Sequence, residues 1–402
     1  MMTRTPDMPV HIRRDRFEPA PELGRLRTEQ PVSRVRLVTG APAWLVTRYE
    51  DVREVLGDSG RFGNSEDGRP AGAPPLRVPD AEAEVPRLWS PGNLLAYDPP
   101  DHTRLRRLVT GEFTVKRMRR LRPRIEAIVT EHLDAMERSG PPVDLVQSFA
   151  LPIPSLVICE LLGVPYTDRA DFQHRSNIRL DLSLGLDRRV AAMREAQEYM
   201  AGLVAAQRKR PGEDMLGMLV REHGDEISDE ELTGLADLLL IAGHETTSNM
   251  LGLGTLFLLR NPGHLAWARQ DEHIDAVVEE LLRHLSIVHT VIPRVVRADT
   301  VISGQPLKAG DLVVCSLPAA NRDPALTADP DRFDPGRKVS HLAFGHGIHH
   351  CLGAPLARME MRIAYPALLR RFPALRPAVP FEEIRFRMYS VVHGLESLPV
   401  TW

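Results

Sequence analysis

The sequence predicts a mainly α-helical protein with small β-sheets, and three observations support this fold class. Apolar residues recur at helical spacing from about residue 99 to 290, interrupted by short breaks that contain Pro and Gly. Short β-branched segments lie on both sides of this region. No internal repeat divides the 402 residues. We therefore expect one domain over residues 1–402, with a polar N-terminal segment at 1–30.

The composition excludes several classes of protein. Lys and Arg total 51 against 54 Asp and Glu, whereas nucleic-acid-binding proteins usually carry a basic excess. The three cysteines, Cys159, Cys315 and Cys351, are too few for a disulfide framework. No apolar run approaches the ~20 residues that cross a bilayer, and the N-terminus lacks the apolar core of a signal peptide. We expect a cytoplasmic monomer that binds neither membranes nor nucleic acid.

The first expected element is a hairpin. Residues 32–38 and 43–47 alternate or run β-branched around a Thr-Gly-Ala-Pro turn. Residues 57–98 are rich in Gly, Pro and Asp, which predicts a long irregular loop. Residues 99–101, Pro-Pro-Asp, are a typical helix start, and helical patterns follow with breaks at 141–142, 152–154, 163–165 and 211–212.

Two later helices have clear signals. Ser228 and Glu231 form a capping box, and the pattern that follows continues to Arg260, about 33 residues or roughly 50 Å. Residues 274–285 place their Ile, Val and Leu residues on one face of the next helix. Short strands are expected at 300–303 and 312–316, and a final helix after the third cysteine, kinked by a proline at position 366.

The most informative segment is residues 344–353, Phe-Gly-His-Gly-Ile-His-His-Cys-Leu-Gly. Its glycines allow unusual backbone angles and let the chain lie close to a flat ligand. Cys351 stands just before a helical pattern, whose free N–H groups favour a thiolate, a strongly donating metal ligand. From the residues alone two alternatives stay open. Cys351 could be an inert core cysteine, or it could bind zinc with the neighbouring His346, His349 and His350.

The pattern F-G-x-G-x-H-x-C-x-G in this segment resembles the haem-ligand signature of the cytochrome P450 superfamily. The resemblance implies the cytochrome P450 fold, a helical bundle around a b-type haem. It also implies Cys351 as the axial thiolate ligand of the iron, with Phe344 and Gly345 beside the cofactor. A thiolate pushes electron density onto iron and favours O–O cleavage. The resemblance covers nearly the whole chain and is strongest to soluble actinobacterial members of antibiotic and other secondary-metabolite pathways.

The long predicted helix carries Ala-Gly-His-Glu-Thr-Thr at residues 242–247. Ala242 and Thr246 are four residues apart and share a face, and an adjacent carboxyl and hydroxyl suit proton delivery. Taken alone, the pattern is explained better by an ordinary buried helix with a capped polar pair. Beside the cysteine segment, the pattern resembles the oxygen-activation motif of the family. The resemblance implies that Thr246 relays protons, that Glu245 is its acidic partner and that Ala242 lies beside the haem.

Glu280 and Arg283 match the E-x-x-R element of the same family. From the helical pattern alone they lie opposite the apolar face, where an exposed ion pair contributes little. The resemblance adds Arg337 as a third member and implies a structural cluster rather than a catalytic one.

The two propionates of a haem need cationic or hydrogen-bonding partners. Taken singly, each candidate residue is an ordinary polar side chain. Taken together they match the propionate-binding residues of the family: His102, Arg106, Arg294 and His349.

Between residues 101 and 124 the chain has nine Lys and Arg residues. A solvated helix face is the simplest explanation, and no nucleic-acid-binding motif accompanies the charges. The resemblance implies a docking face for an acidic ferredoxin, which passes on electrons from NAD(P)H and a reductase, because this chain has no flavin or iron–sulfur motif. The candidate contacts are Arg104, Arg107, Arg358 and Arg362.

The resemblance implies a monooxygenase that uses O2 to hydroxylate or epoxidise a medium-to-large apolar natural product, with a macrolide or other polyketide favoured. Residues 57–98 and 166–212 are expected to cover the substrate pocket. Two alternatives stay open, a non-catalytic haem-thiolate recruitment or sensor protein and a peroxide-driven relative. The expected pocket residues are Trp89, Leu94, Leu95, Leu239, Ala242, Val291, Ile292, Val391 and Val392.

Overall fold

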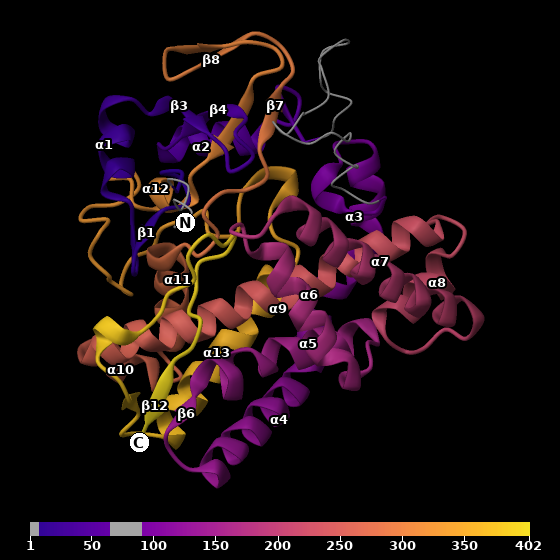
Figure 1. Ribbon diagram of the computed structural model, residues 1–402, viewed down its shortest axis with the longest axis vertical. Coiled ribbons are helices and arrows are strands. Elements are labelled where there is room, and N and C mark those ends of the chain that lie inside the picture. Colours follow the sequence, from indigo (N-terminus) through magenta and orange to yellow (C-terminus); the bar gives the residue numbers. More distant parts are fainter. Residues whose placement is uncertain (1–7, 65–90) are drawn as a thin grey trace, which may run out of the picture.

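A computed structural model describes residues 8–64 and 91–402 of the chain. Over these ranges helices form most of the molecule and the strands are short (Figure 1), so the predicted fold class is confirmed. Trp89, an expected pocket residue, lies outside the described residues.

The strands gather into four small sheets. In chain order they are β1 (Arg14–Asp15), β2 (Glu18–Pro19), β3 (Val32–Arg36), β4 (Pro42–Val46), β5 (Phe62–Gly63), β6 (Val143–Asp144), β7 (Arg294–Val296), β8 (Thr300–Ile302), β9 (Gln305–Leu307), β10 (Leu312–Cys315), β11 (Arg376–Pro377) and β12 (Pro399–Thr401). The largest sheet has the order β3-β4-β10-β7-β5. Its β3 and β4 are antiparallel and form the predicted hairpin, whereas β10 joins β4 in parallel.

The α-helices occupy most of the chain between these strands. They are α1 (Pro21–Glu29), α2 (Tyr49–Gly57), α3 (Asp101–Thr110), α4 (Val115–Ser139), α5 (Pro152–Leu162), α6 (Arg169–Leu180), α7 (Leu186–Lys209), α8 (Met215–His223), α9 (Asp229–Arg260), α10 (Pro262–Ala268), α11 (Ile274–Leu285), α12 (Leu317–Asn321) and α13 (Ala354–Arg371). Most predicted breaks are confirmed. The break predicted at 152–154 is wrong, because a proline at the first helical position favours a helix start, and α5 begins there.

Helix α9 is the longest element and crosses the molecule (Figure 1). Its 32 residues begin with the predicted capping box, in which the Ser228 hydroxyl accepts from the Glu231 N–H and the Glu231 carboxylate accepts from the Ser228 N–H. The helix packs against α5, α7 and α13. It therefore reaches every part of the helical core.

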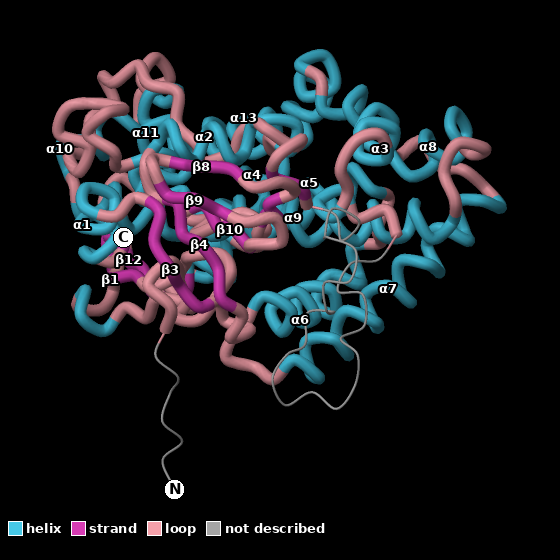
Figure 2. The backbone as a smooth tube through the Cα atoms, turned by 90° about the horizontal axis from the view of Figure 1, so that it is seen from above, coloured by secondary structure: helices cyan, strands magenta, loops and turns pink. Residues whose placement is uncertain are grey.

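The five-stranded sheet and the helical core occupy different parts of the molecule, whereas the sheet of β11, β12 and β6 packs against the helical core. Figure 2 shows β3, β4, β9 and β10 together at one side, with α6, α7 and α8 at the other. The larger apolar core joins α4, α5, α9, α11 and α13, and a smaller one lies between α2 and the five-stranded sheet. The predicted apolar face of α11 is buried in the larger core. Among the described residues, no helix is long and apolar enough to cross a membrane.

Candidate active site

A cavity of about 600 Å³ opens beside the middle of α9. Residues from α3, α7, α9, the cysteine segment and the chain near 391 line it, and its wall is mostly apolar. Of the nine expected pocket residues, eight lie on this wall: Leu94, Leu95, Leu239, Ala242, Val291, Ile292, Val391 and Val392. The structure thus brings together segments that are far apart in the sequence.

The cysteine segment forms a tight loop that reaches the cavity wall through Phe344, Gly345 and Cys351. Gly345 and Gly347 have φ angles of 73° and 72°, in the left-handed region that favours glycine. A Cβ at Gly347 would lie 2.3 Å from the Leu56 carbonyl oxygen, so the loop packs too closely against α2 for any side chain there. The Cys351 N–H donates to the Phe344 carbonyl at 2.9 Å, which fixes the direction of the cysteine.

The surroundings of the Cys351 sulfur act in two directions. Burial raises the pKa of the Cys351 thiol, while the N–H groups of Gly353 and Ala354 and the charges of Arg106 and Arg358 partly oppose this effect. The expected stabilisation by the start of α13 is therefore present but smaller than the cost of burial. A metal ion deprotonates a coordinating thiol outright, and the same N–H groups and arginines would then stabilise the thiolate.

The four residues expected at the propionates line the same cavity, and we call them the cradle: His102, Arg106, Arg294 and His349. The His102 and His349 rings lie 4.3 Å apart, and Arg106 Nη2 donates to the His350 carbonyl at 2.7 Å. Burial, followed by the charge of Arg294, lowers the pKa of His349 to about 3. Burial also lowers the pKa of Arg294.

Two atoms of the cradle test whether it fits a haem. Within the described ranges, His102 Nε2 and Arg294 Nε are buried and have no hydrogen-bond partner. Buried polar atoms are almost always paired, so a cluster with two free nitrogens and few acids calls for an anionic ligand. The carboxylates of haem propionates match this requirement, and the residues present fit the group.

Sequence analysis missed Asn64, which joins two members of the cradle. Its Nδ2 lies 3.1 Å from His349 Nε2, and its Oδ1 accepts from Arg294 Nη1. It stands at the end of β5, 285 residues before the histidine that it contacts. A lone Asn beside a Gly- and Pro-rich stretch gives no local signal for this role.

The acid and alcohol predicted on α9 both line the cavity. The Thr246 hydroxyl donates to the Ala242 carbonyl at 2.9 Å, one turn back along the helix. Glu245 is 1% exposed, and its Oε2 accepts from Arg387 Nη1 at 3.2 Å. His244 Nε2 lies 3.6 Å from Glu245 Oε1. Burial favours the neutral acid, but the His244 and Arg387 contacts outweigh it and hold the pKa of Glu245 below its usual value.

Arg387 and His244 are the partners of Glu245 that sequence analysis missed. Arg387 belongs to an irregular segment 142 residues later in the chain, so no spacing rule could have found it. His244 is completely buried, and its Nδ1 lies 2.7 Å from the Leu240 carbonyl. Its position next to Glu245 in the sequence made it a candidate partner of that acid, but the motif assigns no role to this position.

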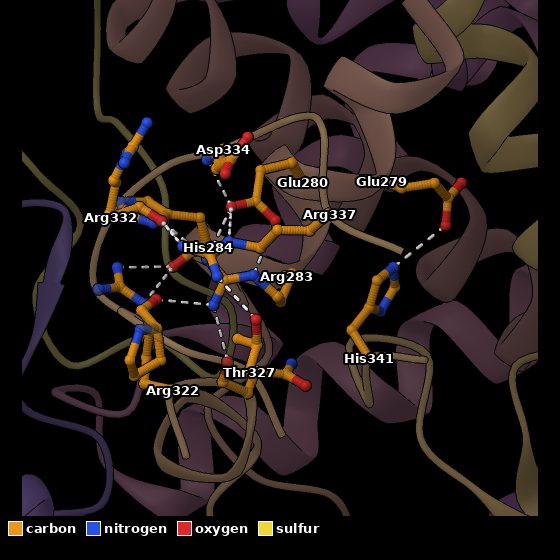
Figure 3. Close-up of polar contacts among 12 residues, drawn as sticks. Glu279, Glu280, Arg283, His284, Arg322, Thr327, Arg332, Asp334, Arg337 and His341 are labelled. Carbon is orange, nitrogen blue, oxygen red and sulfur yellow. Dashed lines mark hydrogen bonds and ion pairs between the residues drawn. The ribbon is translucent and has the colours of Figure 1, made fainter. Parts of the chain in front are cut away.

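The E-x-x-R residues form a buried cluster with Arg337, which we call the scaffold cluster: Glu280, Arg283 and Arg337 (Figure 3). Arg283 Nε and Nη2 donate to the Glu280 carboxylate at 2.7 and 2.8 Å, and Arg337 Nε lies 3.3 Å from Glu280 Oε1. The exposed ion pair suggested by the helical pattern is wrong, because the chain from 321 to 337 covers that face of α11.

The four arginines expected to meet a ferredoxin all form ion pairs within the chain. Arg104 pairs with Glu231, and Arg107 pairs with Glu226 at 3.0 Å. The other two bind acids of α11: Arg358 with Glu279 at 2.7 Å, and Arg362 with Asp275 at 2.9 Å. Their role in docking stays a prediction.

The alternatives for the cysteines can be compared with the geometry. Cys159 and Cys315 are buried, and burial raises the pKa of each thiol to about 12, as expected for inert core residues. Cys351 instead lies on the cavity wall. In the part of the chain that the structure describes, no three His, Cys, Asp or Glu side chains are placed to hold a metal ion together, so the zinc alternative has no support there.

The family model described as Cytochrome P450 matches residues 187–393. Cytochrome P450 FAS1 of Rhodococcoides fascians is 46% identical over 100% of both chains. Among solved structures, P450 StaH from glycopeptide antibiotic A47934 biosynthesis has a TM-score of 0.84 and 47% identity, covering 98% of this chain and 100% of its own. CYP105P1 in complex with filipin I has a TM-score of 0.89 and 40% identity, covering 97% of each chain.

Proposed function

The chain belongs to the cytochrome P450 family and is a monooxygenase of that family, and from this premise we propose that it hydroxylates or epoxidises a medium-to-large, largely apolar natural product. The observation that carries the proposal is one cavity in which Cys351, the cradle and the Glu245–Thr246 pair meet. Such a cavity combines a metal ligand, anion-binding groups and a proton source within one apolar wall.

The haem of this family, bound through a cysteine thiolate, supplies the activation of O2. In the proposed mechanism Cys351 binds the iron, and the cradle with Asn64 binds the propionates. The apolar wall excludes water and presses the substrate against the cofactor.

Proton delivery in the proposal depends on α9. Arg387 Nη1 donates to Oε2 of Glu245, and Oε1 makes no hydrogen bond with any described residue, so Oε1 is the proposed atom that takes up and gives the proton. The Thr246 hydroxyl, on the next residue of α9, is the proposed donor into the cavity once it no longer bonds the Ala242 carbonyl.

The substrate class is proposed from the wall and from two neighbours. Leu, Val, Ile and Met side chains dominate the wall, which suits an apolar skeleton. One similar structure serves the biosynthesis of a glycopeptide antibiotic and another binds filipin I. A macrolide or related polyketide is the substrate we favour, entering beneath the segment 166–212. Most of the other expected cover, 57–98, lies outside the described residues, because 65–90 are not described.

The electron donor is proposed to be a small acidic ferredoxin that receives electrons from NAD(P)H through a reductase. Lys116, Arg119 and Arg120, at the start of α4, are exposed and form no ion pair with any described residue. They follow closely on α3, which carries Arg106 of the cradle. These unpaired charges extend the expected docking face, and steering by them should weaken as salt is added. The monomeric state and the cytoplasmic location stay predictions.

The decisive experiment is the Soret band of the reduced, carbon-monoxide-treated protein. We expect a strongly red-shifted band that Cys351→Ala abolishes and that the matched control Cys159→Ala retains. A band that survives in Cys351→Ala overturns the proposal.

Two alternative functions make different predictions for turnover. A recruitment or sensor protein would bind ligands without forming product when ferredoxin, reductase and NAD(P)H are supplied. A peroxide-driven relative would turn over with peroxide as fast as with reduced ferredoxin. The Glu245–Thr246 pair favours the monooxygenase, because neither alternative needs proton delivery to O2.

A further inference from the structure

Helix α7 presents one face to the cavity. Leu186, Val190, Met193 and Gln197 are spaced by four, three and four residues, so they form one stripe along the helix, and all four line the cavity. Arg189, next to this stripe, lines the cavity as well. This part of the wall therefore combines three apolar side chains with the Gln197 amide and a guanidinium group.

A second arginine on the same wall has its charge balanced within the protein. Arg179 of α6 donates from Nη1 and Nη2 to the two carboxylate oxygens of Asp237, at 2.7 and 2.8 Å. The two side chains are 16% and 8% exposed, so this is a largely buried bidentate pair between α6 and α9.

Arg189 has no such partner. Its Nε donates to the Arg179 carbonyl at 3.1 Å, and it forms no ion pair with any acid in the described ranges. The nearby Asp181 accepts from the N–H and the hydroxyl of Ser183 with the same oxygen, Oδ1. Burial lowers the pKa of Arg189, and the charge of Asp181 only partly opposes this effect.

The other charged groups on the described wall are accounted for. Arg106 and Arg294 belong to the cradle, and Glu245 is held by Arg387. Burial raises the pKa of Glu360 well above its usual value and so disfavours the charged form of that acid. Apart from the cradle, Arg189 is therefore the arginine of the described wall that forms no ion pair with a described acid.

We infer that Arg189 forms an anion-binding subsite in the cavity and that the substrate, within the proposed class of natural products, is an amphipathic molecule with a free carboxylate. The planar guanidinium matches a carboxylate in a bidentate pair, while the α7 stripe contacts the apolar part of the molecule. The carboxylate anchors one end of the substrate and so determines which carbon reaches the reaction centre. This inference rests on the proposed function only in taking the bound acid to be the substrate.

The test compares acids with their own methyl esters, which remove the charge and keep the shape. We use one flexible pair, myristic acid and methyl myristate, and one rigid pair, deoxycholic acid and its methyl ester. Dissociation constants are measured near neutral pH on the haem-loaded protein, by the Soret shift and independently by calorimetry. We expect at least one acid to bind about tenfold more tightly than its ester.

Two substitutions show whether Arg189 causes the preference. Arg189→Gln should remove the preference for the acid over its ester. Arg189→Lys should keep part of this preference, because a lysine retains the positive charge but not the two parallel N–H donors of the guanidinium group. The matched control Arg188→Gln changes an exposed arginine one position away and should keep the full preference. No preference for either acid, or a preference that survives in Arg189→Gln, overturns the inference.

The inference and the proposed function can fail separately. Loss of the red-shifted Soret band would refute the proposed function, and calorimetry would still report the preference for acids. A normal band with no such preference would refute only the subsite at Arg189.

Discussion

The scaffold cluster and the cradle are both buried and rich in arginine, yet they treat their polar atoms differently. In the scaffold cluster, Arg283 uses all five of its N–H groups, on Glu280 and on the carbonyls of Asn321, Pro330 and Arg332. In the cradle, His102 Nε2 and Arg294 Nε have no hydrogen-bond partner among the described residues.

This difference in pairing distinguishes residues that stabilise the fold from residues whose polar atoms are left to bind a ligand. Arg337 Nε of the scaffold cluster also makes no hydrogen bond among the described residues, but it lies 3.3 Å from the Glu280 carboxylate, so the charges of that cluster are balanced within the protein. Removing one member of a charge-balanced buried cluster leaves a charge without a partner, which is costly to stability. Removing a member of an unsaturated cluster changes the stability of the protein little and weakens the binding of the ligand.

The largest effect is expected in the scaffold cluster. Arg283→Met leaves the Glu280 carboxylate buried without its main partner and should lower the free energy of unfolding by about 3–5 kcal/mol. Urea unfolding measures the loss. Arg122→Met, which breaks an exposed pair with Glu126 on α4, is the control and should change nothing measurable. Equal unfolding midpoints for both variants would remove the contrast.

Thr246→Ala tests a cavity residue that contributes little to the fold. Product formation should fall about 100-fold, the range of a lost proton-transfer group, while the Soret band with carbon monoxide and the unfolding midpoint stay unchanged. Thr255→Ala is a matched control, because Thr255 makes the same bond to the carbonyl one turn back, at 2.7 Å, but does not line the cavity. Unchanged turnover in Thr246→Ala would exclude the predicted relay.

Arg294→Gln tests the cradle. It removes a charged donor to the propionates, so haem should leave about tenfold faster, measured by transfer to apomyoglobin. The protein without haem should be no less stable, because burial lowers the pKa of Arg294 and the nearby Cys315 and Asp98 oppose this effect only in part. Arg36→Gln, on the exposed part of β3, is the control. A loss of stability without a change in haem release would place Arg294 with the scaffold cluster.

The smallest effect concerns a third buried set, His11, His289 and His393, which surrounds Arg14. Burial lowers the pKa of His11 to about 4 and of His393 to about 3, and lowers that of His289 well below its usual value. In the unfolded chain these histidines take up protons below a pKa near 6.5, whereas in the folded protein they stay neutral until the pH is much lower. The contribution of these histidines to the free energy of unfolding is therefore fully present above pH ~6.5 and decreases as the pH falls below it.

The His393→Gln variant isolates one member of this set. Between neutral pH and pH ~5.5, the wild-type protein should lose about 1.4 kcal/mol more than the variant, measured by urea unfolding at each pH. Parallel losses in the two proteins would show that His393 takes up its proton in the folded state as readily as in the unfolded one.

Much of the fold was predictable because its signals are local. The capping box of α9 depends on Ser228 and Glu231, which are three residues apart. The apolar stripe of α11 follows from helical periodicity within 12 residues. Helix α5 shows the limit of such rules, since its prolines looked like a break and are instead its start. Periodicity also misplaced Glu280, because it describes a helix in isolation. It does not show that residues 321–337 of the same chain cover the polar face of this helix.

The candidate site was predicted in part. The cysteine segment and the α9 motif are short patterns, and the cavity brings their residues together. Asn64, Arg387 and Arg189 carried no such pattern. Asn64 and Arg387 act through partners that folding places beside them, whereas Arg189 stands out because folding places no ion-pair partner beside it among the described residues. Each role therefore depends on coordinates rather than on spacing.

The family can be recognised from the sequence alone, and short patterns of at most ten consecutive residues predict the cysteine ligand and the acid–alcohol pair. Which charges are balanced depends on how the chain folds. Arg179 meets Asp237 across 58 residues, while Arg189, ten residues after Arg179, meets no acid among those described. Electrostatic pairing acts through space, and the order of residues along the chain does not contain the distances that it depends on.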